Sequence, residues 1–353
     1  MALFTPFTLR GLTLKNRVAV SPMCQYSALD GVPNDWHMVH LGSRAVGGAA
    51  LVMTEASAVL ADGRISPGDA GIYNDAHVVA WQPITRFIQS QGAVAAMQLA
   101  HAGRKASTDL PWRGGKPIAV EQGGWSPIPA PSALAFSDEY QVPHEMSLEQ
   151  ILVCVAAFRR AAQRALEAGF SIVEVHAAHG YLVHEFLSPL SNRRTDQYGG
   201  SFDNRTRLLR EIVVAIREIW PENLPLFVRI SATDWVDGGW DIEQSIALAK
   251  QLKPLGVDLI DVSSGGNVAH VKIPVGPGYQ VPFAARIRHE ADIPTIAVGM
   301  ITESLQAEAI IESGEADMVM LARELLRDPY WPRRAAHDLG VSLPPPDQYQ
   351  RAW

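Results

Sequence analysis

Eight short apolar runs, each followed by a stretch with helical periodicity, constrain the fold of this chain more than any other feature. The runs lie at residues 17–20, 50–55, 93–99, 172–176, 226–230, 259–262, 295–298 and 318–321. Helical stretches follow at residues 36–46, 76–90, 147–167, 204–220, 241–255, 282–290, 302–312 and 331–339. Apolar runs without strict alternation are typical of parallel strands buried on both faces. Eight such units predict an α/β fold, a closed (β/α)8 TIM barrel that forms one domain over residues 1–353.

An open doubly wound sheet is the competing fold, but no glycine-rich dinucleotide fingerprint follows the first run. Residues 7–14 alternate about a glycine turn and predict a hairpin that caps the bottom of the barrel. A long insertion after the third strand, residues 100–146, is rich in Pro, Gly and Trp, and we expect a lid-like loop there. The tail, residues 344–353, is three prolines followed by an aromatic segment, and we expect it to dock on a surface.

Composition excludes several classes of protein. Of the residues, 47% are hydrophobic and 19% are charged, which is enough apolar surface for a large core. The net charge of −7 and the lack of a basic run argue against a nucleic-acid partner. Two cysteines cannot form a disulfide scaffold, a four-cysteine zinc site or a four-cysteine iron–sulfur cluster. Neither a signal peptide nor a long apolar run is evident, so we expect a soluble cytoplasmic protein without a membrane partner.

The residues at the carboxyl ends of the predicted strands converge on one mouth of such a barrel. They are rich in hydrogen-bond donors: Cys24, Tyr26, Gln98, His101, Arg104, Lys105, His176, His179, Tyr181, Arg229 and Arg323. Among these strand ends only Glu55 supplies a carboxylate, whereas paired-acid hydrolases and divalent-metal barrels need several. A mouth of this kind suits an anion or an electron-accepting ring. A metal-dependent lyase or hydrolase that uses His176 and His179, with Glu55 as third ligand, stays open as the alternative.

Five segments resemble the old yellow enzyme family, the FMN-dependent ene-reductases, and in particular the thermophilic-like branch that includes the xenobiotic reductase A type. The segments are SPMCQY at 21–26, QLAHAGRK at 98–105, HAAHGYL at 176–182, SNRRTDQYGGS at 191–201 and RELLRDP at 323–329. The related dienoyl-CoA reductases carry an iron–sulfur cluster and a second nucleotide domain, for which this chain has neither the cysteines nor the length.

The resemblance implies an FMN site at the mouth. The residues implied to line the flavin ring are Ser21, Pro22, Met23, Cys24, Ala56 and Gln98. Arg229 would lie beside the N1/O2 edge, where its fixed positive charge would favour the reduced flavin. An ion pair within the barrel wall is the alternative role of Arg229, disfavoured because no acidic residue is placed at the adjacent strand ends. Residues implied at the phosphate are Ser263, Gly299, Ala322 and Arg323, with Ala322 in place of the glycine that close relatives carry.

The resemblance also implies the chemistry. NADPH would reduce the flavin, which would then reduce an α,β-unsaturated carbonyl compound. His176 and His179 would bind the substrate's carbonyl oxygen, and Tyr181 would donate a proton. Tyr26 and Lys105 would contact the substrate. A barrel that stores or senses FMN without catalysis is a further alternative, disfavoured because it has no use for the His–His–Tyr cluster.

Arg351 resembles a residue that this branch inserts into the active site of a neighbouring subunit. The tail would then lie at a subunit interface, and the enzyme would be a homodimer or homotetramer. Packing of Trp353 on its own barrel is the alternative.

Overall fold

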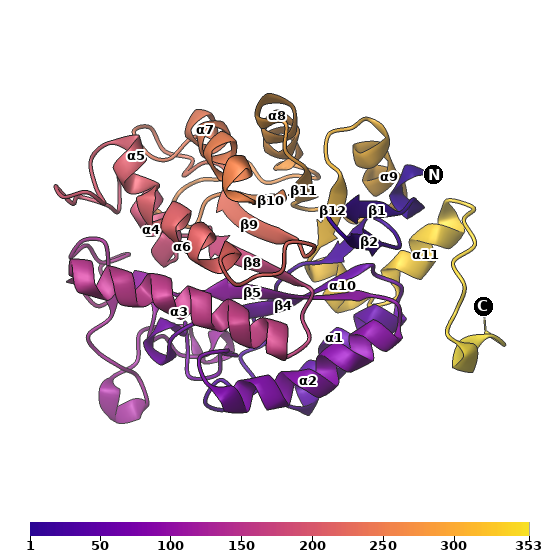
Figure 1. Cartoon of the computed structure of the whole chain (residues 1–353), viewed down its shortest axis with the longest axis horizontal. Coiled ribbons are helices and arrows are strands. Elements are labelled where there is room, and N and C mark those ends of the chain that lie inside the picture. The colour runs from indigo at the N-terminus through magenta and orange to yellow at the C-terminus, as the bar shows by residue number, and fades with distance from the viewer. Residues whose placement is uncertain (353) are drawn as a thin grey trace.

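Eight parallel strands form a closed barrel in the computed structural model, which describes residues 1–352 (Figure 1). The strands are β3 (Val18–Val20), β4 (Leu51–Ala58), β5 (Val94–Ala100), β8 (Ile172–Ala177), β9 (Leu226–Ser231), β10 (Leu259–Ser263), β11 (Thr295–Val298) and β12 (Met318–Leu321). They neighbour one another in chain order, and β12 pairs with β3 to close the ring. The predicted (β/α)8 barrel is therefore confirmed.

Helices surround the barrel on its outer face (Figure 1). The longer ones are α1 (Asp35–Val46), α2 (Asp75–Ser90), α3 (Leu148–Glu167), α6 (Arg207–Arg217), α7 (Ile242–Leu252), α8 (Val281–Ala291), α9 (Ser304–Glu312) and α11 (Trp331–Asp338). Short helices are α4 (Leu182–Leu187), α5 (Phe202–Arg205) and α10 (Arg323–Arg327), and single 3₁₀ turns are η1 (Ala2–Phe4), η2 (Ala61–Gly63) and η6 (Lys253–Leu255). The predicted helix 204–220 is divided into α5 and α6 at Thr206. Helices α4 and α10 were not predicted, because fewer than two turns produce no readable periodicity.

The N-terminal hairpin closes the bottom of the barrel, as predicted. Strand β1 (Phe7–Leu9) pairs antiparallel with β2 (Leu12–Leu14). Leu9 and Leu14 are buried in the same apolar cluster as Leu51, Leu259 and Met318, the first residues of three barrel strands. The hairpin thus covers the apolar barrel interior at the end opposite the carboxyl ends of the strands.

The insertion at 100–146 contains only short elements. They are η3 (Gly103–Lys105), η4 (Pro111–Arg113), η5 (Val120–Gln122) and the parallel pair β6 (Pro129–Ala130) and β7 (His144–Glu145). Ala102, Ala106 and Ile128 form a small apolar cluster, against which Trp125 and Tyr181 pack. The insertion therefore contacts Tyr181 directly, although its role as a lid stays a prediction.

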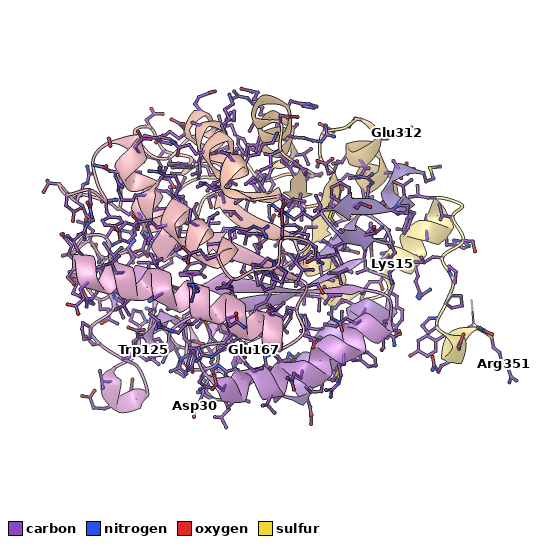
Figure 2. All side chains as sticks on the ribbon, in the orientation of Figure 1. Lys15, Asp30, Trp125, Glu167, Glu312 and Arg351 are labelled. Carbon is purple, nitrogen blue, oxygen red and sulfur yellow. The ribbon has the colours of Figure 1, made fainter. Side chains whose placement is uncertain are left out.

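The C-terminal tail runs beyond α11 and away from the barrel (Figure 1). It ends in η7 (Asp347–Tyr349), and the ring centroid of Tyr349 lies 6.4 Å from that of Tyr330. Arg351 is exposed at the projecting end (Figure 2). The alternative packing of Trp353 falls outside the described residues. Within residues 1–352, no helix has both the length and the apolar character needed to cross a bilayer.

Candidate active site

Strand register brings two of the six predicted ring-lining residues, Ala56 and Gln98, close to the level of His176 and Arg229 in the barrel wall. Ala56 on β4 pairs with Gln98 on β5, which pairs with Glu174 on β8. His176, also on β8, pairs with Arg229 on β9. All five side chains are at least nine-tenths buried. Their polar groups therefore lie side by side at the carboxyl half of the barrel.

The loop after β3, which carries Ser21 to Tyr26, is held from beneath by Glu55. Its Oε2 accepts a hydrogen bond from the backbone N–H of Gln25 at 3.0 Å. The other oxygen, Oε1, lies 3.0 Å from Nε2 of His37. Because Nδ1 of His37 accepts from the N–H of Asn34, the imidazole proton is on Nε2 and faces Glu55. Glu55 is thus a support of this loop, and its oxygens are directed to His37 and Gln25, away from the metal role considered for it.

Cys24 and Tyr26 sit half-buried in this loop. Burial raises the pKa of the Cys24 thiol well above its usual range, and the carboxylates of Asp69 and Glu55 raise it further. Cys24 is therefore a protonated thiol at neutral pH. The ring of Tyr26 meets Trp112 of the insertion edge-on at 6.1 Å, so the loop and the insertion touch.

His176, His179 and Tyr181 form one aromatic cluster after β8. The ring centroid of His176 lies 5.2 Å from that of His179 and 5.0 Å from that of Tyr181, both edge-on. Nδ1 of His176 accepts from the N–H of Ala178, which leaves its proton on Nε2. Nε2 of His179 lies 2.6 Å from the hydroxyl of Ser263. If that nitrogen accepts from Ser263, each neutral imidazole presents one N–H to a ligand.

Protonation states in this cluster follow from burial. Burial, and then the positive charge of Arg229, holds the pKa of His176 and of His179 well below the usual value. Burial also raises the pKa of the Tyr181 phenol well above its usual value. At neutral pH the cluster therefore holds two uncharged imidazoles and a protonated phenol.

Arg229 is ion-paired, and the expectation that it has no acidic neighbour is wrong. Its Nε lies 3.1 Å from Oδ2 of Asp261, a side chain with no exposed surface, and Asp261 pairs with Arg229 in the sheet register. The prediction considered only strand ends, whereas Asp261 lies in the middle of β10. The distal NH1 lies 3.5 Å from the hydroxyl of Ser21.

Glu174 is a second buried acid beneath the mouth. Oε1 accepts a hydrogen bond from the side-chain amide of Gln98 at 2.8 Å, while Oε2 has no hydrogen-bond partner among the described residues. Burial, and then the charge of Asp261, raises the pKa of Glu174 to about 8. Neither Glu174 nor Asp261 was singled out from the sequence, although an acid inside an otherwise apolar strand was a readable signal.

Lys105 fixes the turn that carries His179. Its Nζ donates to the carbonyl of His179 at 2.8 Å and also to the carbonyl of Gly266. The ammonium lies 4.1 Å from the ring centroid of Phe136, in the insertion. Burial, and then the charge of Arg104, lowers the pKa of Lys105 to about 7. The side chain thus joins the insertion, the turn and the segment after β10.

A cavity of about 570 Å³ opens after the last two barrel strands. Gly299, Ala322 and Arg323 line it together with Arg327, so three of the four predicted phosphate residues share one space. The φ angle of Ala322 is −106°, so this position does not have the positive φ that favours glycine. The fourth residue, Ser263, is not among the lining residues, and its hydroxyl contacts His179 instead.

A family model, described as the NADH:flavin oxidoreductase / NADH oxidase family, matches residues 2–341. The chain belongs to this family. The match confirms the resemblance to the old yellow enzymes and shows that the protein is an FMN-dependent oxidoreductase.

Individual relatives agree with the family. The chain is 51% identical to an NADPH dehydrogenase of Geobacillus sp. strain WCH70, over 99% of this chain and 98% of that protein. The structure of an old yellow enzyme homologue from Zymomonas mobilis matches with a TM-score of 0.80 and 27% identity, over 97% of this chain and 94% of that one. A 2-naphthoyl-CoA reductase in complex with 2-naphthoyl-CoA matches with a TM-score of 0.86 and 26% identity. That match covers 96% of this chain and 52% of the reductase chain, so this chain spans about half of the length of the reductase.

The residues of this family member fit FMN. Arg323 supplies positive charge to the cavity predicted for the phosphate, and Arg327 lines it as well, ion-paired at 2.6 Å with Glu324 of the same cavity. At the ring end, Arg229 and the Nε2 proton of His176 are buried donors at the mouth of the barrel. The donor set suits a flavin better than a metal ion, and no group of three His, Cys, Asp or Glu within residues 1–352 is arranged to hold one.

Proposed function

We propose that this protein is an NADPH dehydrogenase that acts as an ene-reductase on α,β-unsaturated carbonyl compounds and related activated alkenes. One observation carries the proposal. Two neutral imidazoles, His176 and His179, meet edge-on at 5.2 Å beside Tyr181, whose phenol keeps its proton. The choice of NADPH follows the name of the relatives from Geobacillus and Bacillus subtilis.

FMN, when bound, supplies the hydride chemistry that couples oxidation of NADPH to reduction of the alkene. Its ring would lie against Ser21, Pro22, Met23, Cys24, Ala56, Gln98 and Arg229, and its phosphate in the cavity of Gly299, Ala322 and Arg323. Ser263 would lie near the flavin ring and not at the phosphate, because its hydroxyl contacts His179.

His176 and His179 bind the carbonyl oxygen of the substrate through Nε2–H and Nδ1–H. Negative charge develops on that oxygen as the alkene accepts hydride. Each fixed donor would stabilise the charge by about 3 kcal/mol if it behaves as a donor of an oxyanion hole. The imidazoles need no reorganisation, because His176 is fixed by the Ala178 N–H and His179 by Ser263.

Tyr181 holds the proton that is transferred to the substrate carbon next to the carbonyl group. Its ring is half-buried between His176 and the apolar cluster of the insertion, which limits the access of water to it. Substrate would enter through a cavity of about 780 Å³ between Phe136–Tyr140 of the insertion and the segment after β10. Tyr26 and Lys105, which do not line this cavity, would contact the substrate next to Tyr181, and the insertion would act as a lid.

We also propose that the enzyme is a homodimer or homotetramer in which Arg351 of each tail enters the site of a neighbour. The exposure of Arg351 at the end of a projecting segment supports this arrangement (Figure 2). Cytoplasmic location is part of the same proposal, because Cys24 and Cys154 are both free thiols.

An anaerobic titration tests the proposed function. NADPH should bleach the flavin absorption of the purified protein, and cyclohexenone should then restore it. A colourless protein that takes up no FMN would refute the proposal, as would a reduced flavin that cyclohexenone leaves unchanged.

A further inference from the structure

A buried histidine–carboxylate pair lies directly beneath the turn that carries His179 and Tyr181. His184 on α4 accepts a hydrogen bond at Nδ1 from the backbone N–H of Gly180, at 3.0 Å. Its other nitrogen, Nε2, lies 3.0 Å from Oδ1 of Asp234. Both side chains are fully buried. Neither was predicted from the sequence, and neither is part of the proposed chemistry.

The turn itself needs external support. His179 has a φ of 59° and Gly180 a φ of 72°, so two successive residues adopt the left-handed region. Residues with a Cβ disfavour that region, and His179 adopts it nonetheless. The turn also lies tightly against the segment after β10, because a Cβ on Gly180 would approach the carbonyl of Gly266 to 2.3 Å. Such a conformation persists only where surrounding contacts determine it.

Those contacts come from several sides. Ser231 accepts from the N–H of His179 at 2.9 Å, and Lys105 donates to its carbonyl. The N–H of Gly180, between the two functional side chains, is bound by His184 alone among the hydrogen bonds of the described residues. An unsatisfied buried N–H is costly, so this acceptor determines where the turn sits.

Asp234 fixes the acceptor. Because Nδ1 of His184 accepts a proton, the imidazole is neutral and its own proton is on Nε2, facing Asp234. The second carboxylate oxygen accepts from the hydroxyl of Ser188 at 2.6 Å and from the N–H of Trp240 at 2.9 Å. Burial would raise the pKa of Asp234, but the hydrogen bonds from His184, Ser188 and the Trp240 N–H outweigh it and hold the pKa below its usual value. The carboxylate thus stays charged and anchors His184 to the loop after β9.

We propose that His184 and Asp234 are positioning residues, which fix the Gly180 amide so that His179 and Tyr181 face the substrate. Neither is placed against the reacting atoms, because His184 is fully buried beneath the turn and Asp234 lies in the wall of the entry cavity. The inference rests on the proposed function, since it assigns these residues to that site.

Two substitutions separate the two contacts of His184. In His184→Asn, the amide oxygen replaces Nδ1 and can still accept from Gly180, but the side chain is too short to reach Asp234. In His184→Gln, the amide nitrogen can reach Asp234, but no acceptor faces Gly180. His77→Gln is the matched control, because His77 is fully buried on α2, with Nε2 3.0 Å from the Asp30 carbonyl, and lies outside the site.

The FMN-loaded enzymes are compared in stopped-flow half-reactions. His184→Gln should slow reoxidation by cyclohexenone about tenfold, as expected for one lost buried hydrogen bond, while NADPH reduction changes less than about twofold. His184→Asn should recover part of the reoxidation rate, because it keeps the acceptor for Gly180 but loses the contact with Asp234. A second readout is calorimetric binding of para-nitrophenolate, an anionic oxygen ligand for the two imidazole N–H groups. Its Kd should rise about tenfold in the Gln variant and much less in the Asn variant.

Equal losses in the Gln, Asn and His77→Gln proteins would show a merely structural role and overturn the proposal, as would unchanged reoxidation in His184→Gln. Should His184→Gln not fold, Asp234→Asn replaces it, and slower reoxidation with unchanged NADPH reduction is again expected. If the wild type reduces no cyclohexenone, the proposed function fails. The para-nitrophenolate affinities then still decide whether His184 positions the imidazoles.

Discussion

The guanidinium of Arg229 lies 3.1 Å from the carboxylate of Asp261, and the carboxylate has no exposed surface. The positive charge that would face a reduced flavin is therefore partly offset from within the barrel wall. Burial raises the pKa of Asp261 to about 6, against the opposing effect of Arg229, so the acid is charged above neutral pH. With the flavin in the proposed position, the Arg229–Asp261 pair, and not Arg229 alone, would act on the flavin potential.

Asp261→Asn should raise the midpoint potential of bound FMN, because the charge of Arg229 then acts unopposed on the anionic reduced state. A rise of about 30 mV corresponds to about 1.4 kcal/mol for a two-electron couple. Spectroscopic potentiometry at about pH 7.5, where Asp261 is ionised, measures it. Glu312→Gln, an exposed substitution on α9, is the control. A lowered potential would contradict this account of Asp261.

Glu174 should make the stability of the protein depend on pH. Its pKa rises from 4.5 to about 8 in the folded state, so the folded protein binds more protons than the unfolded chain between these values. Stability therefore falls as pH rises through this window, by at most about 1.4 kcal/mol per pH unit for one group. In urea unfolding, Glu174→Gln should gain stability relative to wild type between about pH 5 and pH 8. Glu312→Gln should show no such gain, and a parallel pH profile of Glu174→Gln and wild type would disprove the shift.

Replacement of both His176 and His179 by alanine should slow reoxidation by cyclohexenone at least about 100-fold, the effect of losing oxyanion-hole donors. Reduction by NADPH should change far less, because that step builds no charge on a carbonyl oxygen. Stopped-flow absorbance separates the two half-reactions. Equal losses in both would count against binding of the substrate oxygen.

Tyr181→Phe should lower turnover with cyclohexenone about 100-fold or more, the usual contribution of a positioned general acid. Since burial raises the pKa of Tyr181 well above 10, the wild-type rate should show no loss of the phenol proton through neutral and mildly alkaline pH. Steady-state rates across pH test both statements. Unchanged turnover in the Phe variant would mean that the proton comes from water or another group.

If each subunit inserts Arg351 into its neighbour's active site, two different low-activity variants should regain activity when their subunits are mixed. Arg351→Ala and the His176→Ala/His179→Ala protein should each have low activity. A mixed dimer contains one site with intact imidazoles and Arg351 from its neighbour. Random mixing should therefore restore about a quarter of wild-type activity for a dimer with two reciprocal sites. Sedimentation velocity gives the oligomeric state. A monomer, or no recovery after subunit exchange, would exclude the arrangement.

Most of the barrel was predictable because its signals are local. Each strand is a short, mostly apolar run, and the predicted bounds of the strands at Thr295–Val298 and Met318–Leu321 match the structure. The hairpin at the barrel bottom followed from alternation around a turn. The donors of the mouth followed from the rule that carboxyl ends of parallel strands converge. These features depend on residues close together in the chain.

What only the tertiary structure decided is which buried polar groups meet. Arg229 and Asp261 come from neighbouring strands, and Glu55 on β4 lies beside His37 on α1. His184 on α4 lies beside Asp234 in the loop after β9. Each partnership depends on strand register and on the direction of side chains after the barrel closes. A charged side chain buried in a barrel needs an ion-pair or hydrogen-bond partner. The neighbouring sequence does not identify that partner, because the partner is distant in the chain and comes close only when the protein folds.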